Sequence, residues 1–278
     1  MTDYSFSIAT LGCRANQADS DRLRAILSGA GFEEKPFGES VTCSVVNTCT
    51  VTAEADRKSR QLLRRALRVL PEGGQAIATG CAVAQRGGLN KLPGAALRLP
   101  PDRREEILSL LQVEGCPGRE IPSGVSAKTR ALLKIQDGCD QFCTFCIVPF
   151  VRGRERAVDC AEIVRQVENI AAEGFREVTL LGQTVNSYHD GETDFADLLK
   201  AVSAVAGIER VRFTSPYPRD FTAAAIEAMA TLPQVCPALH LPVQSGSNAQ
   251  LEAMQRGYTV EQYRELVLLL RHAVPHLA

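Results

Sequence analysis

The sequence has almost no net charge, because its 278 residues include 31 lysines and arginines against 32 aspartates and glutamates. A nucleic-acid partner would therefore have to be bound by a local basic patch rather than by a bulk field. No apolar run is long enough to cross a bilayer. Residues 1–4 also lack the basic segment of a secretory signal peptide. We expect a cytoplasmic protein with no membrane partner.

The sequence does contain 10 cysteines. In a reducing compartment such cysteines are more often metal ligands than members of a disulfide framework. The length exceeds that of the usual single-core domain and predicts two domains. A turn-rich stretch without periodicity marks the linker. We predict domains over 1–118 and 130–278, joined by a linker over 119–129.

Three segments of the first domain, 6–13, 44–49 and 75–81, are short apolar runs that end in Thr-Leu-Gly-Cys, Thr-Cys and Thr-Gly-Cys. Helical periodicity follows at least the first two, so the pattern predicts an α/β fold with a Rossmann-like parallel sheet covered on both faces. The carboxyl ends of parallel strands share one edge, where Cys13, Cys49 and Cys81 would converge. Each could be a buried packing residue. Three at the same structural position favour shared metal ligation.

The second domain repeats strand and helix patterns, which predicts part of a TIM-like (β/α) barrel. We expect strands near 132–135, 178–181, 210–213 and 238–242, and helices near 161–173, 195–205, 222–231 and 260–272.

Cys139, Cys143 and Cys146 lie on a tight loop after the first of these strands. Three close thiolates can hold three irons of a 4Fe-4S cube and leave the fourth iron open to a substrate. The alternative is a structural zinc site, which needs four ligands, usually in closely spaced pairs. No such pair completes the set, and the histidines are scattered: His189, His240, His272 and His276.

This loop, with Phe145 just before its last cysteine, resembles that of the radical S-adenosylmethionine (SAM) enzymes. The resemblance implies that Cys139, Cys143 and Cys146 bind the cluster and that SAM occupies the open iron. One electron, from a donor such as flavodoxin or ferredoxin, would cleave SAM to a 5′-deoxyadenosyl radical.

Further motifs resemble the methylthiotransferase family over essentially the whole chain; they are residues 10–17, 46–52, 79–81, 133–139, 146–153 and 240–247. The resemblance implies that Cys13, Cys49 and Cys81 hold a second, auxiliary 4Fe-4S cluster. One SAM would methylate a sulfur there, and a second would yield the radical that activates the substrate carbon. An unactivated C–H bond needs a radical, and the incoming sulfur needs a carrier nearby.

Members of this family modify either the tRNA adenosine just 3′ of the anticodon or an aspartate of a ribosomal protein. Residues 47–52 are similar to the tRNA branch, since the ribosomal-protein branch typically carries Gly-Phe after the cysteine. Residues 47–52 and 134–146 resemble the threonylcarbamoyl-adenosine enzymes. Residues 182–188 and 256–259 resemble the isopentenyl-adenosine enzymes. We slightly favour the first.

A helix expected from Ala53 would carry Arg57, Arg60, Arg64 and Arg68 in one narrow stripe, with leucines on the other side. The stripe predicts phosphate contacts with RNA. The alternative is an ordinary solvated face.

Candidate cofactor contacts lie at or just past the predicted strand ends: Gln183, Asn186, Gln244, Ser245 and Ser247. Turn and cap chemistry explains the same residues equally well. The remaining cysteines match no family ligand position, and we expect them to pack or to be inert: Cys43, Cys116, Cys160 and Cys236.

The family pattern continues past residue 278 with more of the barrel and a small RNA-binding domain, which leaves the activity of this chain open. One alternative is an inactive truncated remnant that keeps both ligand sets. Another is a metal-stabilised RNA-binding module without catalytic activity.

Overall fold

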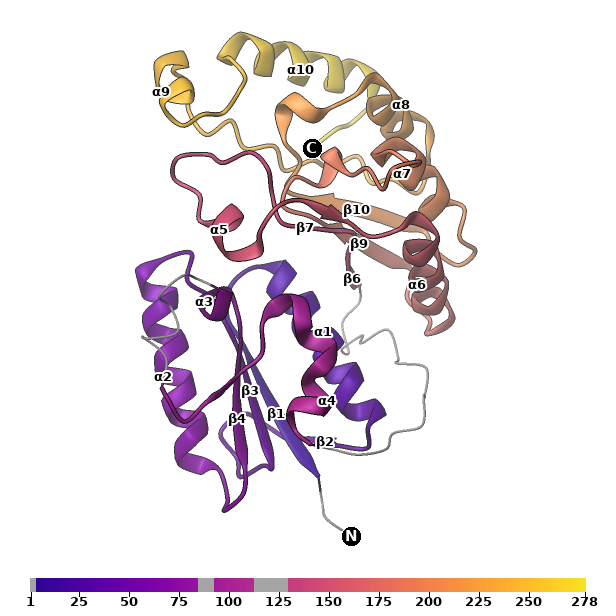
Figure 1. Cartoon of the computed structure of the whole chain (residues 1–278). Helices are drawn as coiled ribbons and strands as arrows, with labels where there is room; N and C mark the ends of the chain where they lie inside the picture. Colours follow the sequence, from indigo (N-terminus) through magenta and orange to yellow (C-terminus); the bar gives the residue numbers. More distant parts are fainter. Residues whose placement is uncertain (1–3, 85–92, 113–129) are drawn as a thin grey trace. The chain divides into compact units, whose positions relative to one another are not determined.

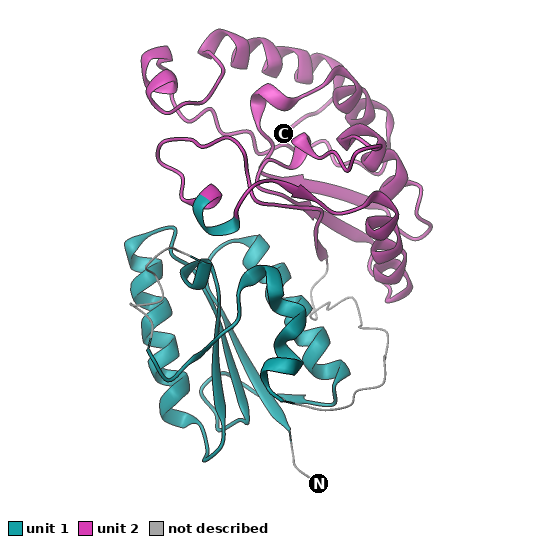
Figure 2. Cartoon of the chain, viewed as in Figure 1, with its two compact units in different colours: residues 1–126, 150–152 teal, residues 127–149, 153–278 magenta. Residues whose placement is uncertain are grey.

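The computed structural model describes residues 4–84, 93–112 and 130–278. The chain forms two compact units (Figure 2): residues 1–126 with 150–152 make unit 1, and residues 127–149 with 153–278 make unit 2. The predicted linker, 119–129, and Cys116 lie outside the described residues, so the predicted boundary stays a prediction.

Unit 1 is built on a parallel sheet with the strand order β2-β1-β3-β4-β5. Its strands are β1 (Ser5–Thr10), β2 (Glu33–Glu34), β3 (Cys43–Thr48), β4 (Gln75–Gly80) and β5 (Leu97–Arg98). The three long strands are those that the sequence predicted. The central strand β3 is buried along its whole length, as expected where helices cover both faces of a parallel sheet.

Helices cover the two faces of this sheet (Figure 1). They are α1 (Arg14–Gly29), α2 (Ala53–Val69), α3 (Cys81–Ala84), the 3₁₀ helix η2 (Pro101–Glu106) and α4 (Ile107–Leu110). On one face, Phe6 and Ile8 pack with Leu23 of α1. On the other, Val46 packs with Leu63 of α2. The doubly covered parallel sheet predicted from the sequence is confirmed.

Unit 2 holds a parallel sheet of order β10-β9-β6 and a small antiparallel pair, β7 with β8. The strands are β6 (Ala131–Lys134), β7 (Gln136–Asp137), β8 (Arg156–Ala157), β9 (Glu177–Leu181) and β10 (Arg210–Thr214). The helices are α6 (Cys160–Ala172), η3 (Val185–Ser187), α7 (Phe195–Ser203), η4 (Pro218–Asp220), α8 (Ala223–Thr231), α9 (Asn248–Ala253) and α10 (Val260–Ala273). The short helix α5 (Val148–Arg152) runs from residues of unit 2 into the segment grouped with unit 1. These repeated strand and helix units form part of a (β/α) barrel, as the sequence predicted.

Local chemistry fixes where the helices begin. Five of them start after a Thr or Asp whose side chain accepts a hydrogen bond from the third N–H of the helix: Thr52, Asp159, Asp194, Thr222 and Thr259. Such caps satisfy backbone donors that have no partner inside the helix.

None of the helices in the described part of the chain is both long and apolar enough to cross a membrane.

The strand predicted over 238–242 is wrong, because this segment has no strand structure. Just before the segment, an isolated bridge joins Val235 to Val211 of β10. Pro237 precedes the segment and Pro242 is its last residue, and proline cannot donate to a ladder. Instead, the Leu239 N–H donates to the carbonyl of Ala278 at 2.9 Å.

Candidate metal centres

In unit 1, three cysteines directly follow three neighbouring parallel strands. Cys13 is the N-cap of α1 just after β1, Cys49 follows β3, and Cys81 follows β4 as the first residue of α3. All three therefore lie at the carboxyl edge of the sheet, where open α/β folds place ligands. Cys49 and Cys13 also lie close enough to Cys81 for their charges to raise the pKa of its thiol.

The ends of β1 and β3 are tied together beside these thiols. The buried side chain of Asn16 donates from Nδ2 to the carbonyls of Leu11 at 2.7 Å and Thr48 at 3.0 Å. Gly12 leaves room for a thiol, because a Cβ atom there would lie 3.1 Å from Cys49 Sγ. The absence of a side chain at residue 12 thus lets the Cys49 side chain lie against the backbone there.

Burial disfavours the anionic form of these thiols, and at Cys81 the buried Arg152 guanidinium offsets only part of that effect. Cys49 and Cys81 are each only 5% exposed. Burial raises the pKa of the Cys81 thiol to about 11. A metal supplies the positive charge that a buried thiolate requires, so the donor chemistry fits an iron–sulfur group.

In unit 2, the pairing of β7 with β8 closes a loop over 138–155 that contains the other cysteine set. Within it, the Cys139 N–H donates to the carbonyl of Gly153 at 3.2 Å, and the Cys146 N–H donates to the carbonyl of Cys143 at 2.9 Å. Cys139 and Cys143 are 7% exposed, and Cys146 is half-buried. The loop brings three thiols together on one short segment.

Gly138 is required at the start of this loop. Its φ of +81° lies in the left-handed region, and a Cβ atom there would lie 2.1 Å from the carbonyl oxygen of Arg154. The two ends of the loop therefore approach too closely for any side chain.

The far side of the loop rests on the segment around η4 and the end of α9. The Thr144 N–H donates to the carbonyl of Met254 at 3.3 Å. The Gln141 side chain donates to Asp220 at 3.2 Å and accepts from Arg219 at 3.0 Å. These contacts fix the loop from outside its own sequence.

Two cysteine sulfurs of the loop accept hydrogen bonds, as the sulfurs of iron–sulfur clusters do. The Gln141 N–H donates to Cys139 Sγ at 3.4 Å, and Arg256 Nη1 donates to Cys143 Sγ at 3.3 Å. Burial raises the pKa of the Cys139 thiol. Within the described ranges no three His, Cys, Asp or Glu side chains converge on a single ion. In a 4Fe-4S cube each thiolate binds a different iron, so its ligands stand further apart, and the loop fits such a group.

Two of the predicted cofactor contacts follow β9. The Asn186 amide is engaged on both sides, since Nδ2 donates to the Tyr217 carbonyl at 3.0 Å and Oδ1 accepts from the Tyr217 N–H at 2.7 Å. Asn186 thus joins η3 to the residues after β10, which is a positioning role. Gln183 lies half-buried just past β9, and its contact with a cofactor stays a prediction.

The other predicted cofactor contacts lie on the irregular segment before α9. Gln244 has a φ of +68°, and Ser245 Oγ accepts from the Ser247 N–H at 3.2 Å. This is turn chemistry, the alternative that the sequence left equally open. Cofactor contact by these three residues stays a prediction.

Sequence reasoning missed Gln136, which is fully buried. Its Oε1 accepts from the N–H groups of Gln183 at 2.9 Å and Thr184 at 3.1 Å, and its Nε2 donates to Ser187 Oγ at 2.9 Å. Gln136 therefore fixes the turn after β9 from the strand that leads into the cysteine loop. The signal in the sequence was its place in the motif 133–139, three positions before Cys139, which gave it no role.

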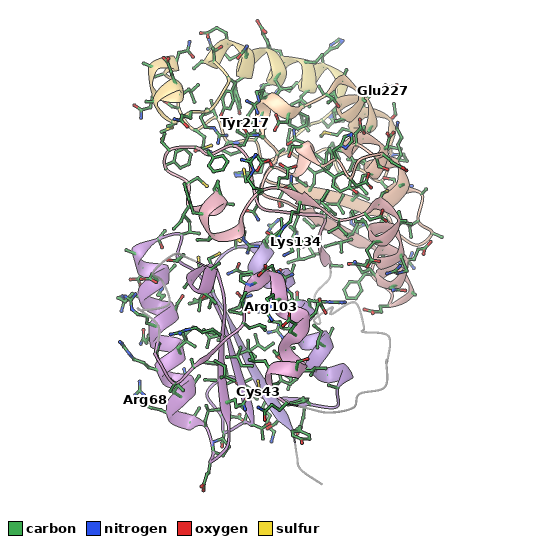
Figure 3. All side chains as sticks on the ribbon, in the orientation of Figure 1. Cys43, Arg68, Arg103, Lys134, Tyr217 and Glu227 are labelled. Atoms are coloured by element: carbon green, nitrogen blue, oxygen red, sulfur yellow. The ribbon has the colours of Figure 1, made fainter. Side chains whose placement is uncertain are left out.

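The basic stripe lies on the outer face of α2, where Figure 3 labels Arg68. Two of its members are partly neutralised, because Arg57 pairs with Glu54 at 2.7 Å and Arg60 pairs with Asp56. Arg64 and Arg68 are exposed and form no ion pair within the described residues. The free positive charge is thus concentrated toward the C-terminal end of the helix.

Three further cysteines lie away from both sets. Cys43 is fully buried in the sheet of unit 1 (Figure 3), and burial raises the pKa of its thiol to about 12. Burial also raises the pKa of Cys160 and of Cys236. That they pack or are inert stays a prediction.

Two family models match the chain. The radical SAM superfamily matches residues 133–277, and Uncharacterized protein family UPF0004 matches residues 5–95. Since the first match covers more than half of the 278 residues, the fold and the cysteine loop are those of the radical SAM class.

Curated relatives narrow this class. The chain is 37% identical over 301 residues to the tRNA-2-methylthio-N(6)-dimethylallyladenosine synthase of Carboxydothermus hydrogenoformans, covering 100% of this chain and 68% of the relative. A protein of the same name from Parafrankia sp. is 40% identical and covers 100% of this chain and 60% of the relative. Another, from Geobacter metallireducens, is 35% identical and covers 97% of this chain and 66% of the relative. The chain belongs to the radical SAM methylthiotransferase family. It spans 60 to 68% of the length of these three relatives.

Solved structures agree on the fold alone. The radical SAM methyltransferase TsrM from Kitasatospora setae matches with a TM-score of 0.66 at 15% identity, over 98% of this chain and 68% of TsrM. The cobalamin-dependent radical SAM enzyme OxsB matches with a TM-score of 0.60 at 13% identity, over 97% of this chain and 48% of OxsB.

Proposed function

We propose that the chain is a tRNA methylthiotransferase, which adds a methylthio group to C2 of an N6-modified adenosine just 3′ of the anticodon. The observation that carries this proposal is the presence of two separate three-cysteine sets. One follows the strands of unit 1 and the other occupies the loop between β7 and β8. A radical enzyme that also delivers sulfur needs both a radical source and a sulfur carrier.

Each set has a distinct role in this proposal. Cys139, Cys143 and Cys146 hold a 4Fe-4S cluster, which together with SAM supplies a 5′-deoxyadenosyl radical when bound. The three cysteines of unit 1 hold the auxiliary cluster: Cys13, Cys49 and Cys81. Gly138 and Gln141 shape the loop of the first site, and Asn16 holds together the strand ends at the second.

The substrate we propose is the N6-dimethylallyl (isopentenyl) adenosine of tRNA. The names of the relatives, at 35 to 40% identity, support it. They give no support to the slight preference for threonylcarbamoyl-adenosine drawn from the sequence. Arg64 and Arg68 on α2 would contact tRNA phosphates, and a flavodoxin or ferredoxin would supply the electron.

Iron and sulfide analysis tests the two-site proposal. After anaerobic reconstitution we expect about eight irons and about eight sulfides per chain, because each set holds a four-iron cube. Changing Cys139, Cys143 and Cys146 together to Ala should halve both numbers, and so should changing Cys13, Cys49 and Cys81. A matched Cys43→Ala variant should keep all the iron, since Cys43 lies in the core of the sheet.

Some outcomes would contradict the proposal. Stoichiometric zinc without iron uptake would leave only a metal-stabilised module. Loss of all iron from either triple variant would mean that the two sets do not form separate clusters.

A further inference from the structure

A buried arginine contacts the cysteine loop of unit 2 from far along the chain. Arg256 follows α9, is 7% exposed, and donates from Nη1 to Cys143 Sγ at 3.3 Å. The contact lies entirely within unit 2.

The guanidinium is held in place by two tyrosines. Its central carbon lies 4.5 Å from the ring centroid of Tyr217 and 5.3 Å from that of Tyr258. Nε also donates to the Tyr258 hydroxyl at 3.2 Å, and that hydroxyl donates to the carbonyl of Val243 at 3.0 Å. The Tyr217 hydroxyl donates in turn to the carbonyl of Arg256 itself. These contacts fix the direction of the guanidinium toward the sulfur.

The charge of Arg256 lacks the usual partner. Across residues 4–84, 93–112 and 130–278, Arg256 forms no ion pair with a carboxylate, although it is buried. A buried cation is costly unless an anion or an aromatic face compensates it. Two aromatic faces are present, and the remaining contact is the sulfur of Cys143. A thiolate that binds iron would complete this compensation.

We propose that Arg256 is a positioning residue that stabilises the reduced state of the unit-2 cluster through its hydrogen bond to Cys143. This rests on the proposed function, because it requires Cys143 to be a cluster ligand. One-electron reduction adds one negative charge to the thiolate-ligated cube, so a fixed cation at the sulfur favours the reduced form more than the oxidised form. Hydrogen bonds to sulfur and net charge are among the factors that set cluster potentials.

The test is a redox titration followed by electron paramagnetic resonance. It uses the full chain with Cys13, Cys49 and Cys81 changed to Ala, so that only the unit-2 cluster remains, with dithionite as the reductant. In this background Arg256→Met should lower the ratio of reduced to oxidised cluster on the order of tenfold at a fixed solution potential. For a one-electron couple this is a midpoint about 59 mV more negative. Arg256→Lys keeps the charge without the planar fork and should recover part of the shift.

Arg165→Gln is the matched control. Arg165 is also an arginine of unit 2, but it lies on α6 and pairs with Glu162 rather than with a cysteine. The midpoint potential of this variant should equal that of the parent.

Two results would overturn the inference. One is an unchanged potential in Arg256→Met with four irons retained, or in Arg256→Gln, which also removes the charge, if the Met variant does not load. The other is an equal shift in Arg165→Gln. A parent chain that takes up no iron at this loop would instead contradict the proposed function, which separates the two failures.

Discussion

At the scale of single residues, the surroundings of each cysteine separate candidate ligands from packing residues. Cys49 and Cys81 follow strand ends, and Cys139 lies in a closed loop, whereas Cys43 is enclosed by apolar side chains of the sheet. All four are buried, so burial alone does not distinguish them. What distinguishes the candidate ligands is their position at an edge or loop where other thiols gather.

The sequence could place these cysteines because their signals are local. Strand-then-Cys and short Cys spacing are properties of neighbouring residues. The roles of Gln136 and Arg256 could not be predicted, because their partners lie far away along the chain. Arg256 is 113 positions from Cys143, and only the packing of α9 against the loop joins them.

Gly138 gives a sharp test at this scale. We expect Gly138→Ala to abolish the unit-2 cluster and to halve the iron content, because the new Cβ would overlap the carbonyl of Arg154. Gly174→Ala is the control, since Gly174 has a φ of +92° but no atom within 4 Å of the added Cβ. The control carries only the backbone strain, on the order of 1 kcal/mol. Iron analysis measures the cluster content, and urea unfolding measures the free energy of unfolding. Full iron in Gly138→Ala would refute the proposed role of the close approach between Gly138 and Arg154.

At the scale of elements, hydrophobic patterns predicted most of the fold. Helix α2 begins at Ala53, where the sequence placed it, and α10 begins at Val260. The two-residue strands β2 and β5 are too short to give a pattern. The strand expected over 238–242 was predicted from its apolar residues. It does not form, because Pro237 and Pro242 cannot donate hydrogen bonds to a neighbouring strand.

Helix α2 also gives the prediction for RNA. We expect the double change of Arg64 and Arg68 to Gln to weaken tRNA binding and to lower the log–log salt slope by about one unit per lost phosphate contact. Arg57→Gln on the same helix should have a smaller effect, because Arg57 is already paired with Glu54. Filter binding across a salt series measures this. Unchanged affinity and slope in the double variant would mean that the stripe is a solvated face.

At the scale of the whole molecule, two α/β units each place a cysteine set at a ligand-bearing edge or loop. Family models match both parts of the chain, 5–95 and 133–277. The sequence established this plan because repeated strand–helix units specify a parallel sheet. It could not establish the substrate, since motifs similar to two substrate branches occur in the same chain.

Mass spectrometry of tRNA nucleosides tests the central claim most directly. It compares cells that carry the gene for this sequence with cells from which the gene is deleted. The deleted cells are also complemented, either with the intact gene or with a version in which Cys139, Cys143 and Cys146 are changed to Ala. We predict that 2-methylthio-N6-dimethylallyladenosine disappears without the gene, that N6-dimethylallyladenosine accumulates instead, and that only the version with all three cysteines restores the methylthio group. An unchanged nucleoside profile without the gene, or full restoration by the triple Ala version, would contradict this account.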